Sequence, residues 1–188
     1  MRIVLVRHGQ TEWSASGRHT STTDLPLSDQ GRHAAEALRQ RLGDRDFALV
    51  LSSPRLRARE TCALAGLTCE IDDDLAEFDY GEYEGLTTKE IRAERPGWSL
   101  WTDGAPGGEV AAQVGERVDR VIARALEAGG DVALFAHGHV LRVLAARWLE
   151  LPSERGASFA LDTASVSELG FERETRVLWH WNVVNGRR

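Results

Sequence analysis

Three apolar runs of this chain lack the polar alternation of a half-exposed strand, and they limit the fold more than any other feature. The runs are Ile3–Val6, Phe47–Leu51 and Val132–Phe135. Strands that are apolar on both faces are typical of a parallel sheet covered by helices. A polar string follows each run directly, and the strings are Arg7-His8-Gly9, Ser52-Ser53-Pro54-Arg55 and Ala136-His137-Gly138. In a parallel sheet these strings would meet at the carboxyl edge, where open α/β sheets bind ligands.

Helical patterns separate the runs. Four segments repeat apolar residues at helical spacing; they begin at Ser28, Pro54, Val110 and Val140 and end near Gly43, Ala65, Gly129 and Pro152. Alternating strands and helices predict βαβ units. Ser165–Gly170 and Thr175–Trp181 instead indicate an antiparallel hairpin. We predict an α/β fold in one domain over residues 1–188, a three-layer α/β/α sandwich with a mainly parallel sheet and a C-terminal antiparallel hairpin.

The charge balance argues against two classes of partner. The 188 residues include 23 basic and 29 acidic side chains, giving a formal net charge of −6. Proteins that bind nucleic acid or anionic membranes usually present a basic surface, so we expect neither partner. No uncharged stretch has the length of a transmembrane helix, and the run between Arg2 and Arg7 is too short for a signal peptide. A cytoplasmic protein is therefore the default expectation.

Two arginines and two histidines would gather at the predicted edge: Arg7, His8, Arg55 and His137. Each has a structural alternative, because a histidine after a buried strand is often only hydrogen-bonded there, and Arg55 could form a surface ion pair. Together they suit a phosphoryl group, since arginine binds two phosphate oxygens at once. Nearby cations favour a neutral, nucleophilic imidazole, and Gly9 would allow the backbone to approach a ligand closely.

Further motifs extend this pattern in a fixed order. They are Leu5-Val6-Arg7-His8-Gly9-Gln10-Thr11, Leu25-Pro26-Leu27-Ser28 with Gly31, Ser52-Ser53-Pro54-Arg55 with Glu60-Thr61, Glu77 with Tyr80-Gly81-Glu82-Tyr83-Glu84-Gly85-Leu86, Pro106-Gly107-Gly108-Glu109, and Ala136-His137-Gly138 with Leu141-Arg142. The ordered set resembles the histidine phosphatase superfamily, which includes cofactor-dependent phosphoglycerate mutases and histidine acid phosphatases. The whole chain is most similar to the small bacterial acid phosphatase branch.

The resemblance implies a role for each catalytic candidate. His8 would be the nucleophile and become phosphohistidine, while Arg7, Arg55 and His137 would hold the phosphoryl group. Glu77 would protonate the leaving oxygen and then activate water; Glu82 and Glu84 are rival carboxylates on the same loop, with a solvated acidic turn as their alternative. The family needs no metal, and we expect neither a metal nor a cofactor here.

Five further residues are candidates for substrate binding: Ser14, Thr20, Ser21, Gly138 and His139. Ser14 stands where many relatives carry asparagine, so its contact with phosphate would run through water. Ser21 stands where mutases have glycine, which predicts a narrower mouth. The irregular segment Pro96–Glu109 is expected to form a loop over the site, with its two tryptophans either as an aromatic wall or as core anchors.

The function that follows is a phosphomonoesterase acting on a small phosphorylated metabolite. The segment Leu86–Val110 is short, whereas the family's mutases carry a longer insertion there with extra basic residues. Hydrolysis is therefore favoured over transfer. A phosphoglycerate mutase is the alternative enzyme, and a non-catalytic sensor of phosphorylated ligands is the alternative from another class. A homodimer is left open.

Overall fold

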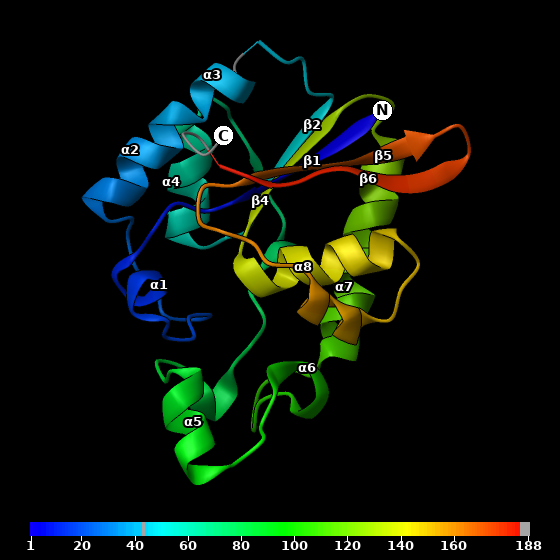
Figure 1. The fold of residues 1–188 in the computed structure, drawn as a ribbon. Helices are drawn as coiled ribbons and strands as arrows, with labels where there is room; N and C mark the ends of the chain where they lie inside the picture. The colour runs from blue at the N-terminus through cyan, green and yellow to red at the C-terminus, as the bar shows by residue number, and fades with distance from the viewer. Residues whose placement is uncertain (43, 185–188) are drawn as a thin grey trace.

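One six-stranded sheet forms the centre of the computed structural model, which describes residues 1–42 and 44–184 (Figure 1). The strand order is β3-β2-β4-β1-β5-β6. The strands are β1 (Arg2–Arg7), β2 (Leu49–Ser52), β3 (Glu70–Ile71), β4 (Val132–Ala136), β5 (Val166–Glu172) and β6 (Thr175–Val183). The first four pair in parallel, whereas β5 runs antiparallel to both β1 and β6. The predicted mainly parallel sheet with a C-terminal hairpin is confirmed.

Helices connect the strands. Within the described residues they are α1 (Glu12–Ser16), α2 (Asp29–Ala37), α3 (Arg39–Leu42), α4 (Leu56–Leu64), α5 (Thr88–Glu94), α6 (Leu100–Asp103), α7 (Ala111–Glu127) and α8 (Gly138–Trp148). Short 3₁₀ turns lie at Asp73–Leu75, Gly81–Tyr83 and Ser153–Ser158. No helix in this part of the chain combines the length and apolar character needed to cross a membrane.

Alternate residues of β1 face opposite helical layers, which explains why the whole run is apolar. Ile3 and Leu5 pack in the cluster that contains the apolar faces of α7 and α8. Val4 and Val6 pack in a second cluster, which includes Leu42 of α3 and Cys62 of α4. Burying each such side chain contributes about 1.5–3 kcal/mol. The three-layer α/β/α arrangement is therefore confirmed.

Some boundaries differ from those predicted. The segment after Ser28 forms two helices, because the Leu38 N–H bonds to the carbonyl of Ala35, three residues back, at 3.1 Å. The expected stop of this segment at Gly43 lies outside the described residues. The segment Pro96–Glu109 is not wholly irregular, since it contains α6.

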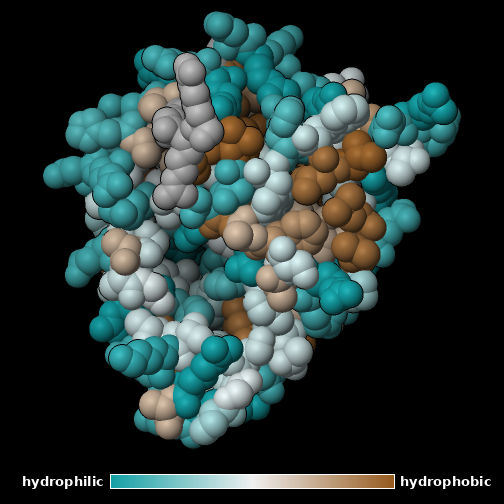
Figure 2. All heavy atoms as spheres, in the orientation of Figure 1, coloured by the Kyte–Doolittle hydropathy of each residue, from teal (hydrophilic) through white to brown (hydrophobic). Residues whose placement is uncertain are grey.

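The carboxyl ends of β1, β2 and β4 lie at one edge of the sheet, as predicted for parallel neighbours. The segment with α5 and α6 extends beyond this edge, below the sheet in Figure 1. Figure 2 shows a hollow in the surface between α1 and α8, at the same edge. The polar strings that end the strands therefore face a cavity.

Candidate functional site

The two predicted histidines meet because β1 and β4 are neighbours. The backbone N–H of His8 donates to the carbonyl of Ala136 at 2.9 Å, which extends the β1–β4 pairing by one residue. The ring centroids of His8 and His137 lie 5.1 Å apart in an edge-to-face arrangement. Sheet register alone thus brings together side chains that stand far apart in the sequence.

The His8 ring is buried and keeps one nitrogen free. It is 5% exposed, and its Nδ1 lies 2.6 Å from the carbonyl oxygen of Gly9. A carbonyl can only accept, so Nδ1 carries the proton and Nε2 carries the lone pair. Burial, followed by the charges of Arg57 and Arg7, holds the pKa of His8 well below 6.5. The ring is therefore neutral, with Nε2 in the form that a nucleophile requires.

Gly9 lies close to the backbone of another segment, and not to the space where a ligand would bind. A Cβ at this position would lie 2.4 Å from the carbonyl oxygen of Gly31 at the start of α2. The Gly9 N–H donates to Oγ1 of Thr61 on α4 at 3.0 Å. The glycine therefore allows the turn after His8 to pack between two helices, which fixes the histidine in place.

Arg57 contacts His137 directly, whereas Arg55 acts on that histidine only through its charge. Arg57 is fully buried, and its Nε donates to Nδ1 of His137 at 3.2 Å. Arg55 precedes α4 as its N-cap, is only half-buried, and does not line the cavity above His8. Helix geometry explains the difference, because the buried positions of α4 are Arg57, Ala58, Thr61 and Cys62. This stripe is the sequence signal that would have identified Arg57.

Both ring nitrogens of His137 have partners. Since Nδ1 accepts from Arg57, the proton lies on Nε2, which donates to Oγ of Ser53 at 2.7 Å. Burial, then Arg57 and His8, holds the pKa of His137 well below 6.5. The residue is fully buried and does not line the cavity. In this structure His137 is thus a neutral ring behind His8.

Arg57 also holds the loop that follows α1. Its Nη1 donates to the carbonyl of Thr23 at 3.1 Å, and its Nη2 donates to the carbonyls of Thr20 and Ser21 at 3.0 and 3.3 Å. The carboxylate of Glu84 accepts from the N–H groups of Ser21 at 2.9 Å and Thr23 at 3.0 Å. Glu84 is therefore a structural anchor of this loop and not part of a solvated acidic turn.

Glu77 lies in the cavity wall and is 6% exposed. Its Oε1 accepts from the N–H groups of Phe78 and Val140, both at 2.9 Å, and its Oε2 accepts from the N–H of His139 at 3.0 Å. Two of these donors belong to the first turn of α8. The rival carboxylate of Glu82 is exposed. Of the three candidate acids, only Glu77 lines the described cavity together with His8.

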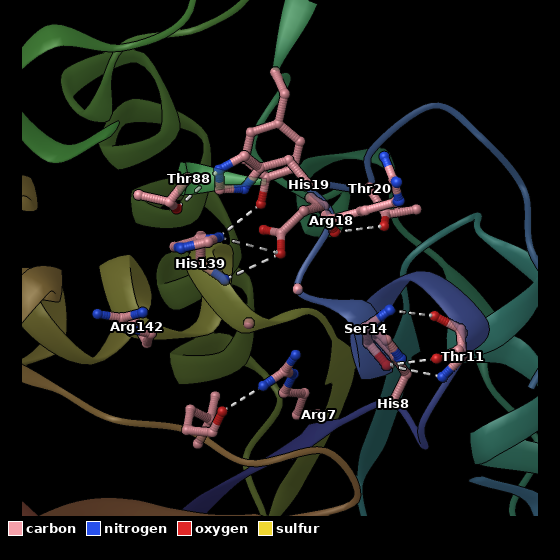
Figure 3. Close-up of a pocket in the computed structure, with 15 residues that line it drawn as sticks. Arg7, His8, Thr11, Ser14, Arg18, His19, Thr20, Thr88, His139 and Arg142 are labelled. Carbon is pink, nitrogen blue, oxygen red and sulfur yellow. Dashed lines mark hydrogen bonds and ion pairs between the residues drawn. The ribbon is translucent and has the colours of Figure 1, made fainter. Parts of the chain in front are cut away.

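The cavity at this edge has a volume of about 250 Å³. Seven of the predicted site residues line it, as Figure 3 shows for those labelled: Arg7, His8, Ser14, Thr20, Glu77, Gly138 and His139. Arg7 donates from Nη1 to the carbonyl of Leu161, while its Nε is buried and bonds to none of the described residues. An unsatisfied buried guanidinium nitrogen at a cavity wall is suited to an anionic ligand.

The predicted substrate-binding residues divide into two groups. Ser14 and Thr20 line the cavity, but their hydroxyls bond to backbone, since Ser14 Oγ accepts from the Thr11 N–H at 2.8 Å and Thr20 Oγ1 donates to the Arg18 carbonyl at 3.1 Å. Ser21 does not narrow the mouth as expected. It is 2% exposed, and its hydroxyl donates to the Glu77 carbonyl at 3.3 Å.

The arrangement does not resemble a metal centre. Among residues 1–42 and 44–184, no cluster of three or more histidine, cysteine, aspartate or glutamate side chains is placed to hold an ion. His137 and His139 are two residues apart but face different partners, the hydroxyls of Ser53 and Tyr80. The donors at the cavity are instead arginines and backbone N–H groups, which suit a phosphoryl group.

Relatives of known function share this fold and length. The chain is 48% identical over 182 residues to an acid phosphatase of Mycobacterium tuberculosis, covering 94% of this chain and 90% of that protein. It is 40% identical to a sedoheptulose 1,7-bisphosphatase of Saccharomyces cerevisiae, over 80% of this chain and 68% of that protein. A glucosyl-3-phosphoglycerate phosphatase of M. tuberculosis is 33% identical, over 96% of this chain and 86% of that protein.

Solved structures are also similar to this chain over nearly its whole length. A protein encoded by an open reading frame of M. tuberculosis superposes with a TM-score of 0.93 at 45% identity, covering 97% of both chains. An α-ribazole phosphatase of Shigella flexneri superposes with a TM-score of 0.85 at 28% identity, covering 97% of this chain and 96% of that one. Residues 3–184 match the histidine phosphatase superfamily (branch 1). The predicted family and the predicted phosphatase class are thus confirmed, and the chain belongs to the histidine phosphatase superfamily.

Proposed function

We propose that this protein hydrolyses small phosphate monoesters without a metal, through a phosphohistidine intermediate on His8, with Glu77 as general acid and base. The observation that carries the proposal is the state of His8. Its ring is neutral, its Nδ1–H is bonded to a carbonyl, and its free Nε2 belongs to a residue that lines a cavity with Arg7 and Glu77. The relatives named as phosphatases support the substrate class.

The first step transfers the phosphoryl group to the enzyme. His8 Nε2 attacks phosphorus, the bond from phosphorus to the ester oxygen breaks, and Glu77 gives its proton to the departing alkoxide. The phosphoryl oxygens carry the charge of the transition state, and Arg7 stabilises it from the cavity wall. The alcohol leaves, and His8 carries the phosphoryl group.

The second step releases phosphate. Glu77, now a carboxylate, takes a proton from water while the water oxygen attacks phosphorus, and the bond between phosphorus and Nε2 breaks. The three N–H groups that donate to Glu77 hold its carboxyl group in one position for both steps. His8 returns to the neutral form from which it began.

Arg57 acts on the phosphoryl site through its charge and through the groups that it holds in place. It lies behind the histidines, bonded to His137 and to the carbonyls of residues 20–23. Its charge lies close enough to lower the pKa of both His8 and His137. Arg57 therefore keeps the nucleophile neutral and adds a second positive charge to the phosphoryl site.

Phosphate release from p-nitrophenyl phosphate, measured with the purified full chain in the presence of EDTA, tests the proposal. We expect turnover that EDTA does not reduce, and a loss of at least about 10³-fold in kcat for His8→Ala. His180→Ala is the matched control, because His180 is an exposed histidine on β6, and it should retain full activity. Full activity of His8→Ala, or loss of activity with EDTA, would refute the mechanism.

The purified full chain also distinguishes the phosphatase from the two alternatives, a phosphoglycerate mutase and a non-catalytic sensor. Interconversion of 3- and 2-phosphoglycerate that is much faster than phosphate release would identify a mutase. Binding of phosphate esters without any turnover would identify a sensor. Net phosphate release without interconversion is the result that the proposal predicts.

A further inference from the structure

The outer part of the cavity contains cationic and donor groups that the proposed hydrolysis does not use. Arg18 of the loop after α1, Thr88 of α5, and His139 and Arg142 of α8 line it (Figure 3). Glu77 is the only carboxylate among the lining residues that the structure describes. Arg142 and Arg18 appear on opposite sides of the cavity in Figure 3. The space that would receive the alcohol part of a substrate is therefore positively charged.

His139 is held in one tautomer by a buried phenol. The Tyr80 hydroxyl lies 2.6 Å from His139 Nδ1, and Tyr80 is 2% exposed. Burial raises the pKa of Tyr80 well above 10, so the phenol keeps its proton and donates it to Nδ1. Burial, then Arg142, holds the pKa of His139 well below 6.5. The imidazole is neutral with its hydrogen on Nε2, which makes that nitrogen a fixed donor.

The guanidinium of Arg142 lies over the ring of a tryptophan. Its Cζ lies 4.5 Å from the ring centroid of Trp101 on α6, a cation–π distance. Its Nε donates to the carbonyl of Gly156 at 3.0 Å, and its Nη2 donates to the carbonyl of Ala157 at 3.1 Å. Its Nη1 has no hydrogen-bond partner among the described residues. Two bonds and one stacking contact therefore fix the guanidinium and leave one amino group available.

Trp101 serves as the common support for both groups. Its ring contacts the His139 ring at a centroid distance of 5.3 Å, as well as the guanidinium of Arg142. His139 and Arg142 are three residues apart on α8 and so lie on the same helix face. Trp101 fits this position because a Cβ at Gly156 would come within 2.5 Å of its ring. The sequence left the role of this tryptophan open, and its contacts show an anchor for two cavity donors.

We propose that His139 and Arg142 form an anion subsite, so that the preferred substrates are phosphate monoesters whose alcohol part carries a second acidic group. This inference rests on the proposed function. Nε2 of His139 and Nη1 of Arg142 bind the second group, while Arg7 and His8 receive the phosphoryl group to be transferred. A carboxylate and a second phosphate share the necessary chemistry, since both accept from a planar guanidinium. Buried or half-buried donors without a ligand discriminate strongly against a neutral replacement.

Two matched substrate pairs test this subsite. 3-Phosphoglycerate carries a carboxylate where glycerol 3-phosphate carries a hydroxymethyl group. Fructose 1,6-bisphosphate carries one phosphate more than fructose 6-phosphate. We expect kcat/KM to be at least about 10-fold higher for the acidic member of at least one pair, which corresponds to about 1.4 kcal/mol. The pair that shows the larger ratio identifies the second group as carboxylate or phosphate.

Variants link the ratio to the two residues. Arg142→Gln should lower the ratio of kcat/KM between the acidic and the neutral substrate several-fold. Tyr80→Phe, which removes the hydroxyl that fixes the His139 tautomer, should lower the same ratio several-fold. The ratio cancels any effect on catalysis that both substrates share. Arg155→Gln is the matched control, because Arg155 is an exposed arginine in the neighbouring 3₁₀ turn, and it should keep both the ratio and the activity of the unmodified protein.

Each outcome has a defined meaning. Equal kcat/KM values within both pairs would overturn the subsite while leaving the proposed hydrolysis intact. A ratio that Arg155→Gln lowers as much as Arg142→Gln would also overturn it, since general charge would then explain the preference. If no ester is hydrolysed, the proposed function fails, and calorimetric binding of 3-phosphoglycerate against glycerol 3-phosphate still decides the subsite: tighter binding of the acid supports it, and equal binding refutes it.

Discussion

Replacing Arg57 should damage the enzyme far more than replacing Arg55, although the two arginines are separated by a single residue. Arg57→Gln removes a fully buried charge, the bond to His137 and three bonds to backbone carbonyls. Arg55→Gln removes a half-buried charge at the N-cap of α4, where the side chain makes no capping bond. The pair is thus a matched comparison of the same substitution on the same short segment.

The magnitudes follow from these contacts. A preorganised group that stabilises transition-state charge contributes about 10²- to 10³-fold in kcat, and we expect Arg57→Gln to lose that much. The three carbonyl bonds at about 1 kcal/mol each give a loss of about 3 kcal/mol in unfolding free energy. For a chain of 188 residues this lowers Tm by roughly 6–12 °C. Arg55→Gln should lose less than about 10-fold in kcat, because Arg55 does not line the cavity and acts on His137 only through its charge.

Hydrolysis of p-nitrophenyl phosphate and calorimetric unfolding measure both effects. Activity is compared at a temperature where circular dichroism shows both variants folded. Arg57→Lys keeps the charge without the planar donor geometry, so its kcat should lie between those of the unmodified protein and Arg57→Gln. Equal losses for Arg55→Gln and Arg57→Gln, or a larger loss for Arg55→Gln, would refute the assignment.

Three other expectations follow from the site. Burial lowers the pKa of four histidines in the folded chain, His8, His19, His137 and His139, so the unfolded chain binds more protons in acid, and the unfolding free energy should fall below pH 6.5 by up to about 1.4 kcal/mol per pH unit for each. Urea unfolding from pH 7.5 to 5 should show this slope, and His139→Gln should reduce it; a slope that His139→Gln leaves unchanged would count against a neutral His139 ring. Gly9→Ala forces a Cβ against Gly31, so it should lower the unfolding free energy by about 1–3 kcal/mol and also lower kcat. An unchanged thermal unfolding temperature would contradict the close approach of the two glycines. Glu84→Ala leaves the Ser21 N–H without its partner and should raise KM for aryl phosphate, and an unchanged KM would argue against its role as the loop anchor.

The sequence was sufficient to predict the sheet and the meeting of His8 with His137. Runs that are apolar on both faces occur in covered parallel strands, and adjacent parallel strands bring the residues after them to one edge. Register then leaves little freedom in where the two histidines lie. The family resemblance added Glu77, whose place in the cavity wall depends on the first turn of α8.

The choice between Arg55 and Arg57 depended on a helix face that the motif alone did not define. Both arginines follow β2 within a few residues, and only the buried stripe of α4 separates them. The outer cavity was even less predictable. Trp101 reaches His139 and Arg142 through packing against Gly156, a contact between segments that no local pattern specifies.

The central claim is that His8 becomes phosphorylated during turnover. Rapid acid-free quenching of the Glu77→Gln variant with p-nitrophenyl phosphate, followed by peptide mass spectrometry, tests it most directly, because an activated leaving group needs little acid catalysis while the second step still needs the base. The account predicts a phosphoryl group on the peptide that contains His8, stable in alkali and lost in acid. A phosphoryl group on any other residue, or turnover by Glu77→Gln at the full rate with no phosphorylated peptide, would contradict it.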